Sequence, residues 1–305
     1  MRERLRFGLA LAAIGAGLVL AGVTLNAGDR RYALPSPAGR VLFLRAGNVA
    51  NRLMLSFDSL AADVYWMRTI QHYGSDRLSR RQQGRFELLY PLLDLTTTLD
   101  PYFTVAYRFG AVFLASPAPD GLGRPDQAIA LLQKGLARSP QQWKYAHDIG
   151  FIYYWYGASS SDAQPDYATA AGWFERAAGM PGAPAWLAPL AAITRAHGGD
   201  RAGARQLLQN LESSEEAWIR RAAERGLQQL KALDEIDALQ RLSDDYLKQH
   251  QTRPSRWADF VPGVKGDDAP LDPAGVPYEF DPATGRVTLS QRSSLWPLPA
   301  ALSHR

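Results

Sequence analysis

Few side chains in this sequence are spaced so that they could do chemistry together. The five histidines stand far apart, without metal-ligand spacing, at positions 72, 147, 197, 250 and 304. No His-Glu-x-x-His motif, Gly-x-Ser-x-Gly elbow or phosphate-binding glycine loop occurs in the sequence. Because cysteine is absent, thiolate catalysis, disulfide bonds and cysteine-ligated zinc are excluded. The sequence therefore predicts no catalytic residue, metal site or cofactor, and an enzyme with dispersed catalytic residues remains a minor alternative.

Aromatic side chains, in contrast, are concentrated in one short stretch. Asp148–Gly157 reads Asp-Ile-Gly-Phe-Ile-Tyr-Tyr-Trp-Tyr-Gly, with five aromatic residues in ten. On a helix, Ile149, Tyr153 and Tyr156 form one stripe, which we expect to pack in a core. The nearly opposite stripe starts at His147 and continues through positions 151, 154 and 155. It either lines an exposed binding groove or is covered by a neighbouring loop or helix.

Length and composition indicate a folded chain of one large domain or two ordinary ones. The chain has 305 residues, 46% of them hydrophobic and 21% charged, so it can bury a substantial core. Its net charge of +4 is not concentrated in any segment with stacking aromatic residues. We therefore expect no nucleic-acid partner.

The N-terminus predicts a membrane anchor. A basic head with Arg2, Arg4 and Arg6 precedes Phe7–Leu25, nineteen residues without a charge. This length is close to the roughly 20 residues that cross a bilayer as a helix. The basic head would stay in the cytoplasm, so the bulk of the chain would lie in the periplasm, tethered to the inner (cytoplasmic) membrane by residues 1–25. A cleaved signal peptide is the alternative.

Residues 26–40 are expected to form a linker rich in proline and glycine, and residues 41–250 a helical domain. In the helical range, breaks with proline, glycine or aspartate return about every forty residues, which predicts structural repeats. The second helices share a motif: a small residue, a large apolar residue four positions later and a further contact seven later. The motif reads Ala128/Leu132/Gly135, Ala170/Phe174/Ala177 and Ala204/Leu208/Leu211.

This motif, with Gly110, Gly150 and Ala192 at the matching position of the first helices, resembles the tetratricopeptide repeat (TPR) over roughly residues 60–215. The resemblance implies an all-α fold, a TPR-like array of helical hairpins (an α-solenoid). In that family, a small residue at these positions lets two antiparallel helices approach closely. Gly135 departs from the pattern, because it stands where the family usually has alanine.

Further helices are expected on both sides of the three repeats. A degenerate helix pair is predicted before them, at 63–73 and 85–99. Two closing helices are predicted at 215–230 and 231–250, the last with a polar outer face that suits a terminal repeat.

The TPR resemblance also implies a binding surface, because the first helices of that family line a concave groove that binds peptides. The partner-binding residues expected on this face are Tyr107, Lys144, His147, Phe151, Tyr154, Trp155 and Trp186. Chaperone-tail binding is not expected, since His147 and Phe151 stand where the carboxylate-binding members need lysine and asparagine.

The last segment, 251–305, predicts a small C-terminal α+β module. Two alternating stretches, Tyr278–Phe280 and Arg286–Leu289, flank Asp281–Gly285, which is a β-hairpin signal. The preceding Asp-Pro-x-Gly-x-Pro-Tyr string resembles the tails of type II secretion pseudopilins. The analogy fails at the N-terminus, where Leu11 replaces the pilin-type glutamate.

Together these features predict a membrane-anchored protein-protein interaction adaptor or scaffold at the cell envelope, which assists a secretion, pilus or export machine. The expected partner is a protein or peptide in the repeat groove. A self-assembling structural subunit of an envelope assembly is the alternative, and the oligomeric state stays open.

Overall fold

A computed structural model of the chain describes residues 57–79, 86–158, 165–265 and 268–299. It is mostly helical, and its residues fall into two compact units that divide between Asp100 and Pro101. The expected anchor at Phe7–Leu25 and the linker at 26–40 lie outside the described residues. Within the described ranges, no helix combines the length and the apolar character that a membrane crossing requires.

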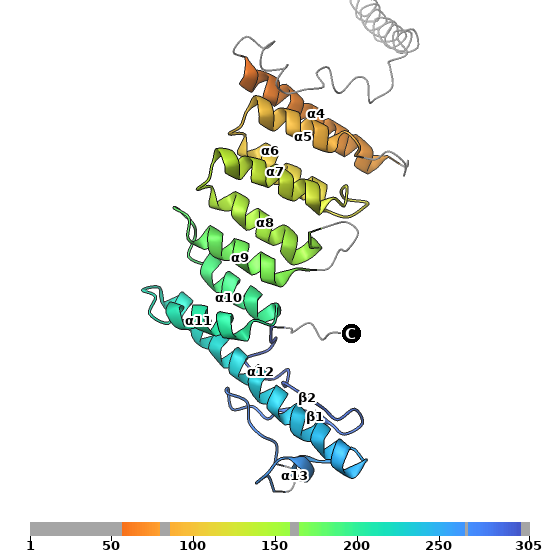
Figure 1. Ribbon diagram of the computed structural model, residues 1–305, viewed down its shortest axis with the longest axis vertical. Helices are drawn as coiled ribbons and strands as arrows, with labels where there is room; N and C mark the ends of the chain where they lie inside the picture. Colours follow the sequence, from red (N-terminus) through yellow and green to blue (C-terminus); the bar gives the residue numbers. More distant parts are fainter. Residues whose placement is uncertain (1–56, 80–85, 159–164, 266–267, 300–305) are drawn as a thin grey trace, which may run out of the picture. The chain divides into compact units, whose positions relative to one another are not determined.

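Among its described residues, the first unit contains the helices α4 (Asp58–Leu78) and α5 (Leu89–Leu99), which pack against each other (Figure 1). This pair confirms the helices expected before the repeats. Their contact is apolar, with Tyr65 of α4 and Leu92 of α5 both buried. The second helix ends at Leu99, and Asp100 is extended, because Pro101 disfavours the helical conformation of the residue before it.

The second unit begins with six helices that follow one another as three antiparallel pairs. They are α6 (Thr104–Ala115), α7 (Pro125–Arg138), α8 (Trp143–Tyr156), α9 (Tyr167–Ala178), α10 (Leu187–His197) and α11 (Arg201–Leu211). Each helix packs against the next, and α6 also contacts α8 (Figure 1). The predicted helical array with consecutive helix packing is confirmed in this coarse sense.

The repeating motif of the second helices is buried, as expected. Ala128, Ala170 and Ala204 are all fully buried, and the large residue four positions later packs beside each of them in the core. At the α8–α9 contact Gly150 allows an especially close approach. A Cβ added at this position would lie only 2.7 Å from the ring carbons Cδ1 and Cε1 of Phe174.

The closing segment corrects one expectation. Instead of two helices at 215–230 and 231–250, the structure has a single helix of 34 residues, α12 (Ala217–His250). The expected boundary falls between the adjacent residues Leu230 and Lys231. Both are good helix formers, so neither ends the helix there. The helix ends at Gln251, which adopts the left-handed conformation typical of helix C-termini.

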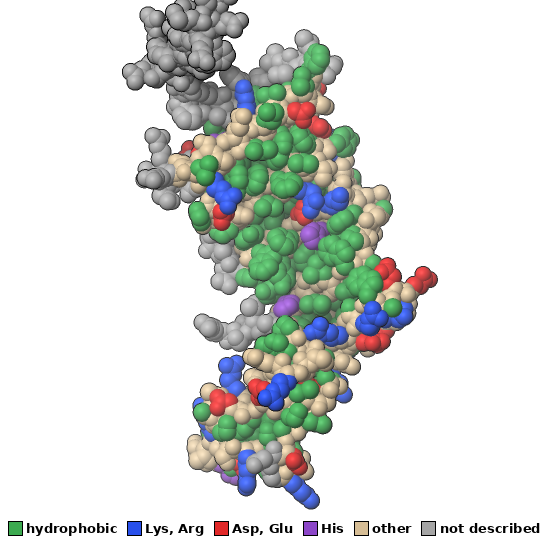
Figure 2. Space-filling model, turned by 180° about the vertical axis from the view of Figure 1, so that it is seen from behind, with side chains coloured by type: hydrophobic (Ala, Val, Ile, Leu, Met, Phe, Trp, Pro, Cys, Tyr) green, Lys and Arg blue, Asp and Glu red, His purple; other side chains and the backbone are tan. Residues whose placement is uncertain are grey.

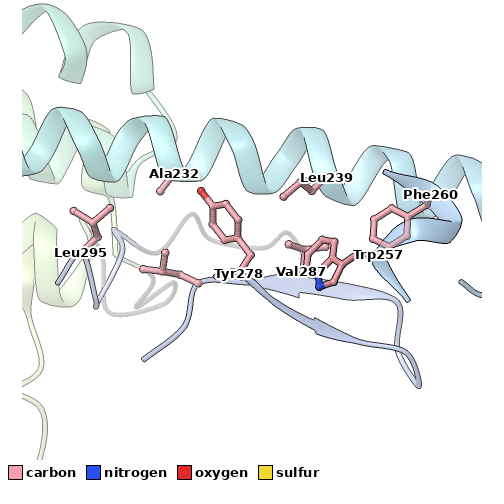
Figure 3. Packing of buried hydrophobic residues seen from close by; sticks show 8 residues of the cluster. Ala232, Leu239, Trp257, Phe260, Tyr278, Val287 and Leu295 are labelled. Carbon is pink, nitrogen blue, oxygen red and sulfur yellow. The ribbon is translucent and has the colours of Figure 1, made fainter. Parts of the chain in front are cut away.

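The second half of α12 is covered by the C-terminal module, which consists of α13 (Trp257–Phe260), β1 (Glu279–Asp281) and β2 (Arg286–Thr288). The two strands pair in antiparallel register, with Phe280 opposite Val287, so the predicted hairpin is confirmed. Figure 3 shows buried side chains of the module lying against Ala232 and Leu239 of α12.

Buried polar groups fix the module to the helix and to itself. The side-chain amide of Gln229 donates to the carbonyl oxygens of Leu295 and Pro297, at 2.8 and 2.9 Å. The buried carboxylate of Asp272 accepts hydrogen bonds from the backbone N–H groups of residues 274 and 276 and from the Ser293 hydroxyl. The carboxylate of Asp272 therefore holds the turn that follows it in one conformation.

We expect Gly150→Ala to lower the free energy of unfolding by about 1–3 kcal/mol, because the new methyl group would overlap the Phe174 ring in a packed core. Gly172→Ala on the exposed side of α9 is the matched control. A Cβ there meets no atom within 4 Å, so the better helix propensity of alanine should stabilise the chain by roughly 0.5–1 kcal/mol. Urea denaturation of both variants measures the difference, and equal effects would contradict the close helix approach.

Candidate functional site

The second unit has an apolar groove between the first helices of neighbouring pairs, α6 and α8. Its volume is about 240 Å³. The lining residues are Arg108, Phe109, Ala111, Val112 and Ala115 of α6 and His147, Asp148, Phe151, Ile152 and Tyr156 of α8. Most of this surface is apolar, so the groove suits apolar side chains better than a polar small molecule.

Large apolar side chains remain exposed along both rims of the groove. On α6, Phe109 is 56% exposed and Val112 is 54% exposed; on α8, Phe151 is 43% exposed and Trp155, one turn further, is 57% exposed. Figure 2 shows hydrophobic side chains gathered on one face of the molecule, with few charged side chains between them. Monomeric proteins rarely leave such contiguous apolar surface uncovered unless it binds something.

An ion pair crosses the groove at one end. Arg108 of α6 donates from Nε and Nη2 to the two carboxylate oxygens of Asp148 on α8, at 2.5 and 3.1 Å. His147 Nδ1 lies 2.9 Å from Asp148 Oδ1, a hydrogen bond when that nitrogen carries the proton. The hydrogen bond to Asp148 raises the pKa of the Arg108 guanidinium above its ordinary value. The pair ties α6 to α8 and leaves the rest of the groove apolar.

The two helices that form the groove run parallel and in register. Tyr145 Oη donates to Thr104 Oγ1 near the start of both helices, and the Arg108–Asp148 pair follows one turn later. Both contacts join residues about one repeat apart, at separations of 41 and 40 positions.

Behind the groove, His147 belongs to an aromatic cluster. Its ring centroid lies 5.6 Å from that of Phe174 and 5.5 Å from that of Trp186, and Trp186 also meets Trp143 edge-on. The Lys144 ammonium lies 5.8 Å from the Trp143 ring centroid, within the range of a cation–π contact. These contacts fix the N-terminal half of α8 against its neighbours.

A second set of rings surrounds Tyr154. Its centroid lies 4.9 Å from that of Tyr167 and 6.3 Å from that of His197, and burial raises the pKa of the Tyr154 phenol. Tyr154 is therefore half-buried against α9 and α10 and is not among the residues that line the groove.

The predicted partner-binding residues thus divide into groups. His147 and Phe151 line the groove, and Trp155 stands beside Phe151 with ring centroids 6.2 Å apart. Trp186 is 41% exposed and meets His147 edge-on, and the half-buried Lys144 stands one turn before Asp148 on α8; neither is among the residues that line the groove. Of the opposite stripe of α8, Ile149 is fully buried as predicted, whereas Tyr153 is half-buried and Tyr156 is half-buried and lines the groove.

Tyr107 is a correction, because it was expected on the groove surface and is fully buried. Its ring packs against Tyr145 at a centroid distance of 5.3 Å. Both rings lie over Gly135 of α7, where an added Cβ would stand 3.1 Å from Tyr107 Cδ1 and 3.0 Å from Tyr145 Cε2. The missing side chain at Gly135 therefore creates the space into which Tyr107 turns.

Several lining residues were not predicted, chiefly Arg108, Asp148, Phe109 and Val112. A signal for the first two was present in the sequence. Opposite charges stand 40 positions apart, which is the repeat period, and equivalent positions of parallel stacked helices are neighbours. The exposed positions of α6 carry no comparable signal, because an apolar residue on a helix reads as core.

One expectation left open was whether an insertion loop covers the aromatic face. The loop Ser116–Arg124 instead folds back on the end of α6, where residues 122 and 124 donate backbone hydrogen bonds to the carbonyl oxygens of Phe113 and Leu114. The second insertion, Ala158–Pro165, lies mostly outside the described residues. Phe151 and Trp155 remain exposed to solvent.

Over the described ranges, no three histidine, aspartate or glutamate side chains come together in a group that could hold a metal ion. Comparison with protein-family models gives no match, and comparisons with curated proteins and with solved structures give none either. The function of this chain therefore has to be inferred from its own geometry.

The Arg108–Asp148 pair should contribute a coupling free energy of about 0.5–1 kcal/mol, because it is bidentate but partly exposed. A double-mutant cycle with Arg108→Met and Asp148→Ala, followed by urea denaturation, measures it. The Arg124–Asp126 pair is the control, since it is also bidentate but local and joins no two helices. A coupling no larger than that of the control would mean that the pair does not tie α6 to α8.

Proposed function

We propose that this chain is an adaptor or scaffold, a TPR-type helical array that binds a segment of a partner protein in the groove between α6 and α8. The single observation that carries the proposal is the pair of exposed apolar rims, Phe109 with Val112 and Phe151 with Trp155. Aromatic residues in such positions contribute large contact area at a small cost in side-chain entropy and are typical hot spots of protein interfaces.

The assignment to the TPR type is supported by the helix pairs and their small buried residues. Ala128, Ala170 and Ala204 recur at the same position of three second helices, and each is fully buried. The first helices α6 and α8 lie side by side, which is the arrangement that forms the binding groove in the resembling family.

An envelope location is part of the proposal. The uncharged segment Phe7–Leu25 behind a basic head would tether the array to the inner membrane, with the groove in the periplasm. The C-terminal module, with its likeness to secretion pseudopilin tails, favours work beside a secretion, pilus or export machine. A tether would raise the local concentration of the adaptor near such a membrane assembly.

The double variant Phe151→Ala/Trp155→Ala should reduce crosslinking to the partner in intact membranes by about tenfold or more, since hot-spot truncations cost at least roughly 1–2 kcal/mol. Its free energy of unfolding should fall by less than about 1 kcal/mol, because both side chains are largely exposed.

Trp218→Ala is the matched control for this experiment, since Trp218 lies on α12 away from the groove and is 43% exposed, as Phe151 is. It should leave crosslinking unchanged. If the double variant loses its helical structure instead, these side chains are core and the groove is not a binding site.

Full-length chain should stay in the membrane pellet after alkaline carbonate extraction, and a chain that lacks residues 2–25 should be released. Alkaline phosphatase fused after the last residue should be active, because it folds only outside the cytoplasm. An inactive fusion, or a shortened chain that still pellets, would overturn the tether and its orientation.

A further inference from the structure

The groove between α6 and α8 offers very few hydrogen-bonding groups to an occupant. Its charged side chains, Arg108 and Asp148, are bonded to each other, and His147 is engaged with the same carboxylate. Apart from the phenol of Tyr156, the remaining walls are apolar side chains such as Val112 and Phe151. An extended peptide buried there would leave backbone N–H and C=O groups without partners, whereas a helix satisfies its own. The occupant that fits is therefore a helix.

The dimensions of the groove agree with this conclusion. The groove is lined by residues 108–115 of α6 and 147–156 of α8, which span roughly 12–15 Å along these helices. Exposed apolar side chains stand three or four positions apart on both rims, at Phe109 and Val112 and at Phe151 and Trp155. A third helix of similar length can place an apolar stripe between these rims, as ridges pack into grooves elsewhere in the array.

The charges at one end of the groove determine which side chains the bound helix should carry at that end. Arg108 of α6 lies in the groove there, and Lys144 stands one turn before Asp148 on α8, so two cations lie near the carboxylate of Asp148. The hydrogen bonds from Arg108 to Asp148 use Nε and Nη2, so the Nη1 amino group retains donor capacity toward a further acceptor.

The N-termini of the two groove helices add to the positive electrostatic potential at this end of the groove. Both groove helices start at the same end, have no acidic residue in the first turn and receive no side-chain cap from Phe103 or Gln142. The partial positive charge of two parallel helix N-termini therefore lies beside the two cations.

We propose that the groove binds an amphipathic α-helix whose apolar stripe is flanked at one end by acidic side chains. This inference rests on the proposed adaptor function and specifies the chemistry of the partner. The acidic flank lies over Arg108 and Lys144, and the apolar stripe lies between the exposed rims of α6 and α8.

Fluorescence anisotropy with labelled peptides and the full chain tests the proposal. The first probe is a peptide of about 14 residues with leucines three and four apart and glutamates at one end. The second carries lysines in place of the glutamates, and the third has a central proline that breaks the helix. The acidic helix should bind at least about tenfold more tightly than either of the others, and added salt should weaken its binding.

Variants of the chain separate the two parts of the proposal. Phe109→Ala should weaken binding of the acidic helix, and Trp218→Ala should not change it. Lys144→Glu should shift the preference from the acidic toward the basic helix, and it leaves the Arg108–Asp148 pair intact.

Two results would overturn the inference and leave the adaptor function standing: equal binding of the proline peptide, or a preference for the basic helix that Lys144→Glu does not alter. Binding of dodecanoate that displaces the acidic helix, together with partner crosslinking insensitive to Phe151 and Trp155, would overturn both proposals, because the groove would then be a lipid site.

Discussion

The close approach of paired helices is the constraint on which the rest of the second unit depends. Phe174 of α9 occupies the space that a side chain at Gly150 would fill, and Ala170 is fully buried beside it. Two helices that meet through glycine and alanine have little freedom to slide or tilt, because small residues bring their backbones together. The α8–α9 pair is therefore closely packed, and hydrogen bonds from α6 to α8 join it to the preceding pair.

Because the pairs stack in this way, residues about one repeat apart in the sequence become neighbours in space. Thr104 meets Tyr145, and Arg108 meets Asp148, at separations close to one repeat. Because the same offset holds along both helices, α6 and α8 run side by side, and a groove forms where their outer faces meet. The side chains on that seam then decide its character, and here they are apolar except for one ion pair.

Much of the fold can be read from the sequence because its signals are local. Proline and glycine breaks mark the helix ends, and the alternation around Asp281–Gly285 marks the hairpin. The unbroken α12 was not predicted, although neither Leu230 nor Lys231 is a proline or glycine that would end a helix there.

The site was harder to predict because it depends on contacts between distant residues. Tyr107 was placed at the surface by its repeat position, and only the missing side chain at Gly135 together with the Tyr145 ring explains its burial. The ion pair could have been found, but only by comparing charges across two repeats after their register was known.

The helices α12 and α8 differ in whether their apolar faces are covered. A helical array exposes an apolar face at its end, and terminal repeats must cover or replace it. Here the C-terminal module covers Ala232 and Leu239 of α12, and the buried amide of Gln229 closes it with two hydrogen bonds. The chain therefore devotes a whole module to shielding one apolar surface and leaves Phe151 and Trp155 open on another. Solubility alone would favour covering both, and this difference is the basis on which we propose a partner for the exposed surface.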